Sequence, residues 1–335
     1  MHSSVNQTTT IPQAPKLSLR LYLVRHGESE ANQRGVFAGQ LDSPLTEHGV
    51  ADAKSLGERS EFFILQEPAD SQPQRADRNS REVHPFFFHR VYSSDLIRAH
   101  DTCKLILEGL RTRQSSTLNN DTDNDRTELG IDSLLKDIRL DNRLRERSYG
   151  TLQGMPWSSD RSDTDKIWVD THGEDELPPI FESDDDIWIR VKKFLLNLIK
   201  EELVLTTDRG SFPQMNSSDT NSTAMPSNET TMKHVLITSH GGVLRQILMR
   251  LVDVDKLKRM GALYDPQRRN RLITPNASLS ILDLSVKCGH QNKIGEEKNL
   301  IKNNCDNNHL EGIDVELILL ANTDHLKAGF RIHKD

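Results

Sequence analysis

Two stretches decide the expected fold: residues 19–28 read LRLYLVRHGE, and residues 234–242 read HVLITSHGG. In each, an apolar run of strand length ends close to a histidine that is followed by glycine. Similar apolar or alternating runs, also typical of strands, occupy residues 86–92, 278–284 and 314–320. Helical patterns occupy residues 47–65, 95–110, 184–203 and 241–252. Strands that alternate with helices predict an α/β fold with a mostly parallel central sheet.

Polar segments interrupt these elements and explain why only 35% of the 335 residues are hydrophobic. Polar side chains gather in four segments, residues 66–84, 111–130, 206–232 and 287–312. Such segments bury too little apolar area to offset the entropy that ordering them would cost. We therefore expect disordered insertions there, and a disordered N-terminus over residues 1–16. Ser94 or Asp95 is expected to cap the helix at 95–110.

Composition excludes several functional classes. The formal charge of −7 argues against a general partner of nucleic acids or anionic membranes. No apolar stretch is long enough to span a bilayer, and the first residues lack the apolar segment of a signal peptide. The three cysteines, Cys103, Cys288 and Cys305, are too few and too widely spaced for a disulfide framework. A reducing, cytoplasmic location is therefore expected.

Charged and polar residues follow three of the predicted strands. The first strand leads into Arg25 and His26, and the run at 234–238 leads into His240. The run at 86–92 leads into two serines, with Arg98 at the start of the next helix. Ligands of open α/β sheets bind at these strand ends, where helix N-termini also favour anions. The pattern predicts an anion site, with Gly27 leaving room for a ligand to approach the backbone.

A neutral imidazole in such a site can attack phosphorus and form a phosphohistidine. Arg25, Arg98 and His240 would disperse the charge of the transferring phosphoryl group. Glu146, within the run RLRERSYG at residues 143–150, is the candidate proton donor for the leaving oxygen. A lone histidine after a strand is usually structural, and a lone glutamate among arginines is usually a solvated ion pair. The joint occurrence of the three motifs favours a catalytic site over these structural roles.

These motifs resemble those of the histidine phosphatase superfamily. The resemblance rests on residues 23–29 with Asn32, and on FAGQLDSPLT at 37–46, SSDLIRAHDT at 93–102, RLRERSYGTLQG at 143–154 and HVLITSHGGVLR at 234–245. It implies a three-layer, phosphoglycerate mutase-like fold. Because the motifs are spread along the chain, one domain is expected over residues 17–330, with the polar segments as insertions.

The resemblance also implies roles for individual residues. The expected catalytic residues are His26, which would be phosphorylated, Glu146 and His240. Phosphate binding is expected from Arg25, Arg98 and Asn32. The expected substrate-binding residues are Gly27, Ala38, Gly39, Gln40, Tyr149 and Gly241. No metal or other cofactor is expected, and the partner would be a small phosphorylated metabolite.

Within the superfamily, the chain resembles the TIGAR-type fructose-2,6-bisphosphatases. The likeness lies in residues 143–150, in Thr274-Pro275-Asn276 and in NTDHL at residues 322–326. Cofactor-dependent phosphoglycerate mutases are a poorer match, because they carry Gly-Trp where this chain has Gly39-Gln40. Ile180 and Phe181 stand where many relatives have two glycines, so we expect a narrower loop there.

The preferred interpretation is a metal-independent phosphomonoesterase, with fructose 2,6-bisphosphate as the first substrate. A mutase that returns the phosphoryl group to a bound product is one alternative, and an inactive adaptor is another.

Arg268, Arg269 and Arg271 belong to a surface loop or hold a second phosphate of the substrate. Trp157 is a candidate for the mouth of the pocket. The sequence does not indicate an oligomeric state.

Overall fold

The computed structural model describes residues 18–59, 88–117, 130–173, 176–204, 232–265, 271–286, 310 and 313–326. The expected disordered N-terminus and most of the four polar segments lie outside these residues. Some residues at the ends of those segments are ordered, contrary to expectation. Met232 begins a strand, and residues 111–117 and Gly130 are helical. The helix continues because each added residue gains a backbone hydrogen bond, and Arg111 pairs with Asp132 at 3.3 Å.

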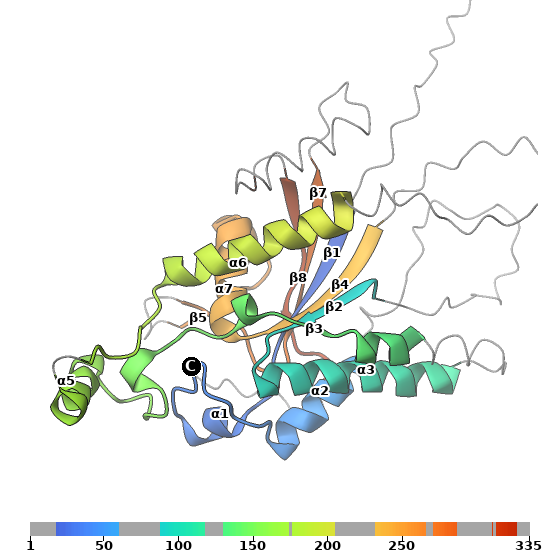
Figure 1. The fold of residues 1–335 in the computed structure, drawn as a ribbon. Coiled ribbons are helices and arrows are strands. Elements are labelled where there is room, and N and C mark those ends of the chain that lie inside the picture. Colours follow the sequence, from blue (N-terminus) through green and yellow to red (C-terminus); the bar gives the residue numbers. More distant parts are fainter. Residues whose placement is uncertain are drawn as a thin grey trace, which may run out of the picture.

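A six-stranded sheet forms the centre of the fold, in the order β3-β2-β4-β1-β7-β8 (Figure 1). Its strands are β1 (Ser18–Arg25), β2 (Arg90–Ser93), β3 (Arg139–Leu140), β4 (Met232–Ser239), β7 (Leu279–Val286) and β8 (Ile313–Asn322). The first four strands in spatial order run parallel, whereas β7 and β8 are antiparallel to their neighbours. The predicted α/β fold with a mostly parallel sheet is therefore confirmed. Two short strands, β5 (Tyr264–Asp265) and β6 (Arg271–Leu272), pair separately.

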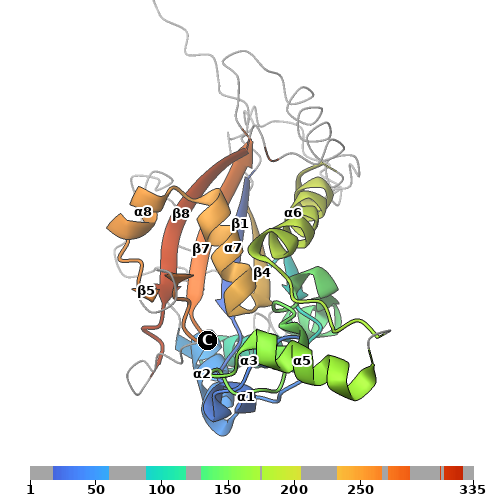
Figure 2. The ribbon, with the colours of Figure 1, turned by 90° about the vertical axis from the view of Figure 1, so that its left-hand side faces the viewer.

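Helices cover both faces of the sheet, which gives three layers. On one face lie α6 (Asp184–Ile199) and α7 (Gly241–Leu251), which pack side by side (Figure 2). On the other lie α2 (Glu47–Arg59) and α3 (Ile97–Thr117). The other labelled helices are α1 (Glu30–Arg34), α5 (Arg161–His172) and α8 (Val254–Arg259), and residues 130–136 are also helical. Short 3-10 turns lie at Asn142–Leu144 and Gly150–Leu152, and a π turn lies at Lys200–Val204. No helix in the described part of the chain is both long and apolar enough to cross a membrane.

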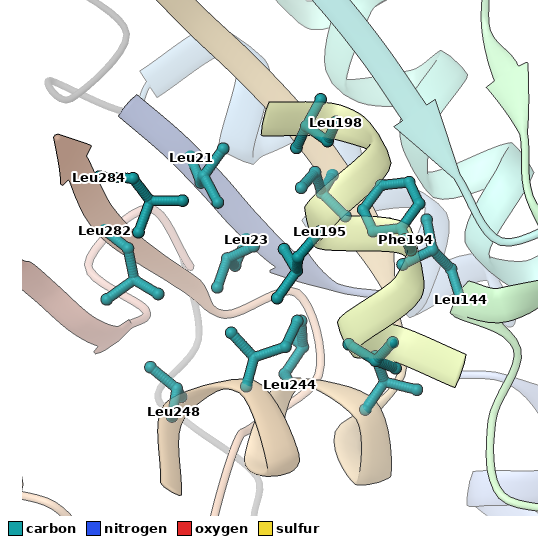
Figure 3. Close-up of a cluster of buried hydrophobic side chains, with 14 of the residues drawn as sticks. Leu21, Leu23, Leu144, Phe194, Leu195, Leu198, Leu244, Leu248, Leu282 and Leu284 are labelled. Atoms are coloured by element: carbon teal, nitrogen blue, oxygen red, sulfur yellow. The ribbon is translucent and has the colours of Figure 1, made fainter. Parts of the chain in front are cut away.

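The alternation of side chains along β1 explains the two cores. Leu21 and Leu23 point to the α6–α7 layer and pack with Leu195 and Leu244 (Figure 3). Tyr22 and Val24 point the other way, into the cluster formed with α2 and α3. Because both faces of β1 are covered, the strand is almost continuously apolar.

Four helical stretches of the described residues were not expected from the sequence, namely α1, α5, α8 and residues 130–136. Of these, α5 lies away from the sheet, and only Thr164 among its residues is buried (Figure 1). Its acidic, weakly apolar sequence therefore gave no helical signal. Of the two expected caps of α3, Ser94 accepts from the amide of Leu96 at 3.3 Å, directly before the helix begins, whereas Asp95 does not act as a cap. Asp95 forms a two-bond pair with Arg145 at 2.7 and 2.6 Å, while the amide of Ile97 donates to the Asp42 carboxylate at 3.0 Å.

Candidate active site

The register of β1 and β4 brings the two His-Gly segments together. Arg25 lies opposite Ser239 in this parallel pair, so the residue after each strand end is a histidine. The amide of His26 donates to the Ser239 carbonyl at 2.9 Å. The rings of His26 and His240 lie 5.0 Å apart between centroids, with a tilt of 59°. Both rings are buried.

Hydrogen bonding and burial keep the imidazole of His26 neutral. Its Nδ1 lies 2.7 Å from the carbonyl oxygen of Gly27, which can only accept, so Nδ1 carries the proton. The other ring nitrogen, Nε2, is then unprotonated. Burial lowers the pKa of His26 well below its usual value, and the charges of Arg98 and Arg25 lower it further. His26 is therefore neutral at physiological pH, with a lone pair on Nε2.

His240 shares the same environment. Its Nε2 and the hydroxyl oxygen of Ser94 are 2.8 Å apart. Burial, together with the charge of Arg98, lowers the pKa of His240 well below the usual value. The buried Nδ1 has no hydrogen-bond partner among the residues that the structure describes.

Two buried arginines supply positive charge beside the histidines. Arg98 donates to the carbonyl oxygens of Leu41 at 2.8 Å and Gly39 at 2.7 Å. Arg25 donates to the carbonyl oxygen of Thr274 at 2.6 Å. Burial lowers the pKa of each guanidinium to about 10, so both remain cations at neutral pH. The arrangement is suited to a dianionic ligand.

Glu146 is fixed by two backbone amides. One carboxylate oxygen accepts from the amide of Arg147 at 2.7 Å, and the other accepts from the amide of Gly242 at 3.1 Å. A Cβ atom on Gly242 would lie 2.2 Å from a carboxylate oxygen of Glu146. The second glycine of the SHGG motif is therefore needed for this approach. The sequence analysis quoted that glycine without giving it a function.

The structure brings most of the predicted site residues into one cavity. Its lining includes eight predicted residues, Arg25, His26, Asn32, Ala38, Gly39, Arg98, Glu146 and Tyr149. The other lining residues are Val36, Phe37 and Trp157. Trp157 was a candidate for the pocket mouth, whereas the sequence analysis missed Val36 and Phe37, which carry no polar or charged signal.

The remaining predicted residues lie around the lining. The side-chain amide of Gln40 donates to the carbonyl oxygen of Glu146 at 3.2 Å. Gly241 lies beside Arg25, since an added Cβ would be 3.4 Å from its guanidinium. For Gly27 the predicted reason for glycine is wrong: a Cβ would lie 2.5 Å from the carbonyl oxygen of Gly49 in α2, so the glycine admits a helix rather than a ligand.

The segment that follows β6 contacts the loop that carries His26. The side-chain amide of Asn276 donates to the carbonyl oxygens of His26 and Gly27 at 3.1 and 3.2 Å, and to Oδ1 of Asn32 at 3.2 Å. The amide of Ala277 also donates to the His26 carbonyl, at 3.1 Å. Thr274-Pro275-Asn276 is a recognisable motif in the sequence, but its sequence alone predicts no role. Its contacts are with residues about 250 positions away, which no local pattern shows.

The expectation of a narrowed loop at Ile180 and Phe181 is wrong for Ile180. That side chain is 79% exposed and is not part of the cavity lining. Phe181 packs edge-on against Tyr149, with ring centroids 5.8 Å apart. Phe181, which does not line the cavity, therefore supports the ring of Tyr149.

Comparison with known proteins agrees with this geometry. Residues 21–86 and 126–205 match the model of the histidine phosphatase superfamily, branch 1. The chain is 30% identical over 237 residues to the 2,3-bisphosphoglycerate-dependent phosphoglycerate mutase of Brucella anthropi, covering 70% of this chain and 82% of that protein. The corresponding enzyme of Brucella ovis is 31% identical over 202 residues, or 58% and 78% of the two chains.

Two solved structures are similar to the chain at lower identity. A mycobacterial glucosyl-3-phosphoglycerate phosphatase is 20% identical, with 90% of this chain and 98% of that chain covered and a TM-score of 0.44. A phosphoglycerate mutase from Bacillus anthracis is 15% identical, with coverage of 93% and 96% and a TM-score of 0.46. The family and sequence matches support an enzyme that acts on phosphate esters. The chain belongs to the histidine phosphatase superfamily.

Proposed function

We propose that the protein is a phosphomonoesterase that works through a phosphohistidine at His26. The observation that carries this proposal is the meeting, in one cavity, of the unprotonated Nε2 of His26 with two buried arginines and a fixed carboxylate. Such a reaction requires three components: a neutral nucleophile, a cationic pocket for the phosphate and a group that carries the proton.

The proposed reaction has two steps. Nε2 of His26 attacks phosphorus, the bond from phosphorus to the ester oxygen breaks, and protonated Glu146 gives its proton to that oxygen. Water then attacks the phosphohistidine, Glu146 takes the water proton, and inorganic phosphate leaves. Arg25 and Arg98 stabilise the charge on the phosphoryl oxygens in both steps. The buried Nδ1 of His240 suits a further contact with a phosphoryl oxygen.

Among substrates, we propose fructose 2,6-bisphosphate first, on the resemblance of residues 143–150 and 274–276 to TIGAR-type enzymes. A second group of cations supports a bisphosphate. Burial lowers the pKa of Arg245, and the charge of Arg271 lowers it further, so these two cations lie near one another and near Tyr149. Their charges favour a second anionic group. Arg268 and Arg269 lie outside the described residues.

A phosphoglycerate mutase is the second candidate, favoured by the Brucella relatives. The two differ only in the acceptor of the phosphoryl group, which is water in the hydrolase and a bound phosphoglycerate in the mutase. The inactive adaptor remains a third hypothesis, and the complete set of site residues argues against it.

Product analysis separates these functions. We expect fructose 2,6-bisphosphate to release inorganic phosphate, and an acid-labile, alkali-stable phosphoenzyme to be trapped. We expect His26→Ala to lose both signals, with turnover falling at least about a thousandfold. His172→Ala, in the exposed α5, is the matched control. Formation of 2-phosphoglycerate from 3-phosphoglycerate and its 2,3-bisphosphate would favour the mutase. Unchanged activity in His26→Ala would rule out the proposed mechanism.

A further inference from the structure

Part of the cavity lining is apolar. Val36, Phe37, Tyr149 and Trp157 line the same cavity as the arginines and Glu146, and each is only partly buried. Their remaining exposed area is therefore surface that a ligand in the cavity can cover. We call these four residues the aromatic wall.

The backbone under the aromatic wall is held by an antiparallel pair of segments, residues 35–37 and 154–157. The amide of Phe37 donates to the Met155 carbonyl at 2.8 Å, and the amide of Gly154 donates to the Phe37 carbonyl at 2.7 Å. The amide of Trp157 donates to the carbonyl of Gly35 at 2.9 Å. Phe37 and Trp157 thus start from positions fixed by main-chain hydrogen bonds.

The rings also support one another. Phe37 and Tyr149 lie 4.9 Å apart between centroids, and Phe181 packs on the other side of Tyr149. The guanidinium of Arg161 lies 4.7 Å from the centre of the Phe181 ring and backs this stack from α5. Burial raises the pKa of Tyr149, so its hydroxyl stays neutral and does not repel a phosphate. The aromatic wall is therefore built in advance of ligand binding.

We propose that the aromatic wall binds the alcohol part of the ester, and that it selects alcohols carrying a ring with an apolar face. This inference rests on the proposed function. The cavity has a volume of only about 30 Å³. With the phosphoryl group held at Arg25 and Arg98, the alcohol therefore extends out of the cavity along the aromatic wall, where a flat ring can cover exposed aromatic faces. An acyclic acid such as a phosphoglycerate has no ring to cover these faces, and its carboxylate would lose hydration against Val36, Phe37 or Trp157.

The test compares alkyl phosphates that have similar leaving groups. We expect kcat/KM to be about tenfold higher for benzyl phosphate than for propyl phosphate, because only the benzyl ring covers the wall. In Trp157→Leu we expect this ratio to fall at least about threefold, mainly through a higher KM for benzyl phosphate. Trp168→Leu, whose ring stacks on His172 outside the cavity lining, is the matched control.

Phe37→Leu is the second wall variant and carries the test if Trp157→Leu does not fold. Equal kcat/KM for the two esters in the wild-type protein, or an unchanged ratio in the folded wall variant, would overturn the inference. In both cases phosphate release shows that the proposed function stands. If no ester is turned over and no phosphoenzyme forms, the proposed function fails, and the inference fails with it.

Discussion

The chemistry of His26 depends on which ring nitrogen holds the proton, and Gly27 decides this through its carbonyl oxygen. That carbonyl also accepts from Asn276, whose amide contacts the His26 carbonyl as well. Asn276 touches the backbone of the nucleophile but does not line the cavity. It is therefore a positioning residue, which fixes the carbonyl that sets the tautomer of His26.

Replacing Asn276 tests this positioning. We expect Asn276→Ala to lower kcat about tenfold with little change in KM, because it leaves two buried carbonyls without this donor while the phosphate contacts persist. Asn276→Asp adds a negative charge near the imidazole and should raise the pKa of His26 from its lowered wild-type value. NMR titration of labelled histidine, assigned with His26→Gln, measures that shift. A pKa of His26 at 6.5 or above in the wild-type protein would contradict the neutral nucleophile.

At the scale of elements, the site is a consequence of how three of them meet. β1 and β4 run parallel and in register, so both strands end at the same edge of the sheet. α7 begins directly after β4, and its N-terminal amide at Gly242 binds Glu146. The α7 terminus thus positions the proton carrier relative to both histidines.

Gly242→Ala tests that contact between α7 and the carboxylate. The added methyl would lie 2.2 Å from an oxygen of Glu146, so the carboxylate must move. We expect kcat to fall at least about tenfold. The free energy of unfolding should change little, because alanine favours a helix over glycine by about 1 kcal/mol, which offsets the cost of displacing the carboxylate. Kinetics and chemical denaturation measure the two effects.

The control for Gly242→Ala is Gly57→Ala in α2. There an added methyl would lie 2.1 Å from the carbonyl oxygen of Ile106 in α3. Since this contact joins two helices of the core, we expect a loss of about 1–3 kcal/mol in stability. The two variants should therefore show opposite patterns. Loss of stability without loss of kcat in Gly242→Ala would refute the proposed role of that glycine.

At the scale of the whole molecule, buried histidines link stability to pH. His234 in β4 is buried, its Nδ1 lies 2.9 Å from the Tyr22 hydroxyl oxygen, and burial lowers its pKa to about 4. Below pH 6.5 the unfolded chain binds a proton that folded His234 does not. The free energy of unfolding should therefore fall as the pH drops from 6.5 to about 4.

Chemical denaturation across this pH range measures the effect. We expect His234 to contribute a loss of about 2 kcal/mol between pH 6.5 and pH 4, and His234→Gln to remove that share of the slope. His172→Gln, in an exposed position of α5, is the control. An identical pH dependence in wild type and His234→Gln would show that His234 is not the group responsible. Part of the slope should persist, because burial also lowers the pKa of His325 to about 4.

Local patterns were sufficient for much of the fold and the site. Apolar periodicity indicated five of the six strands of the central sheet, and glycine and charge at their ends indicated where His26, His240 and Arg98 would converge. These features are local, because a strand must be apolar where it is buried and a parallel sheet brings its strand ends to one edge. The single domain over residues 17–330 and the cytoplasmic location stay predictions.

The sequence by itself determined the alternation of strands and helices and the chemical types at the strand ends. Only the tertiary structure decided that Gly27 accommodates α2, that Asp42 binds the first amide of α3, and that Asn276 holds the loop that carries His26. It also decided that Phe37 and Trp157 share a cavity with the phosphate site. These contacts join residues far apart in the chain, and the geometry that creates them exists only once the layers have packed.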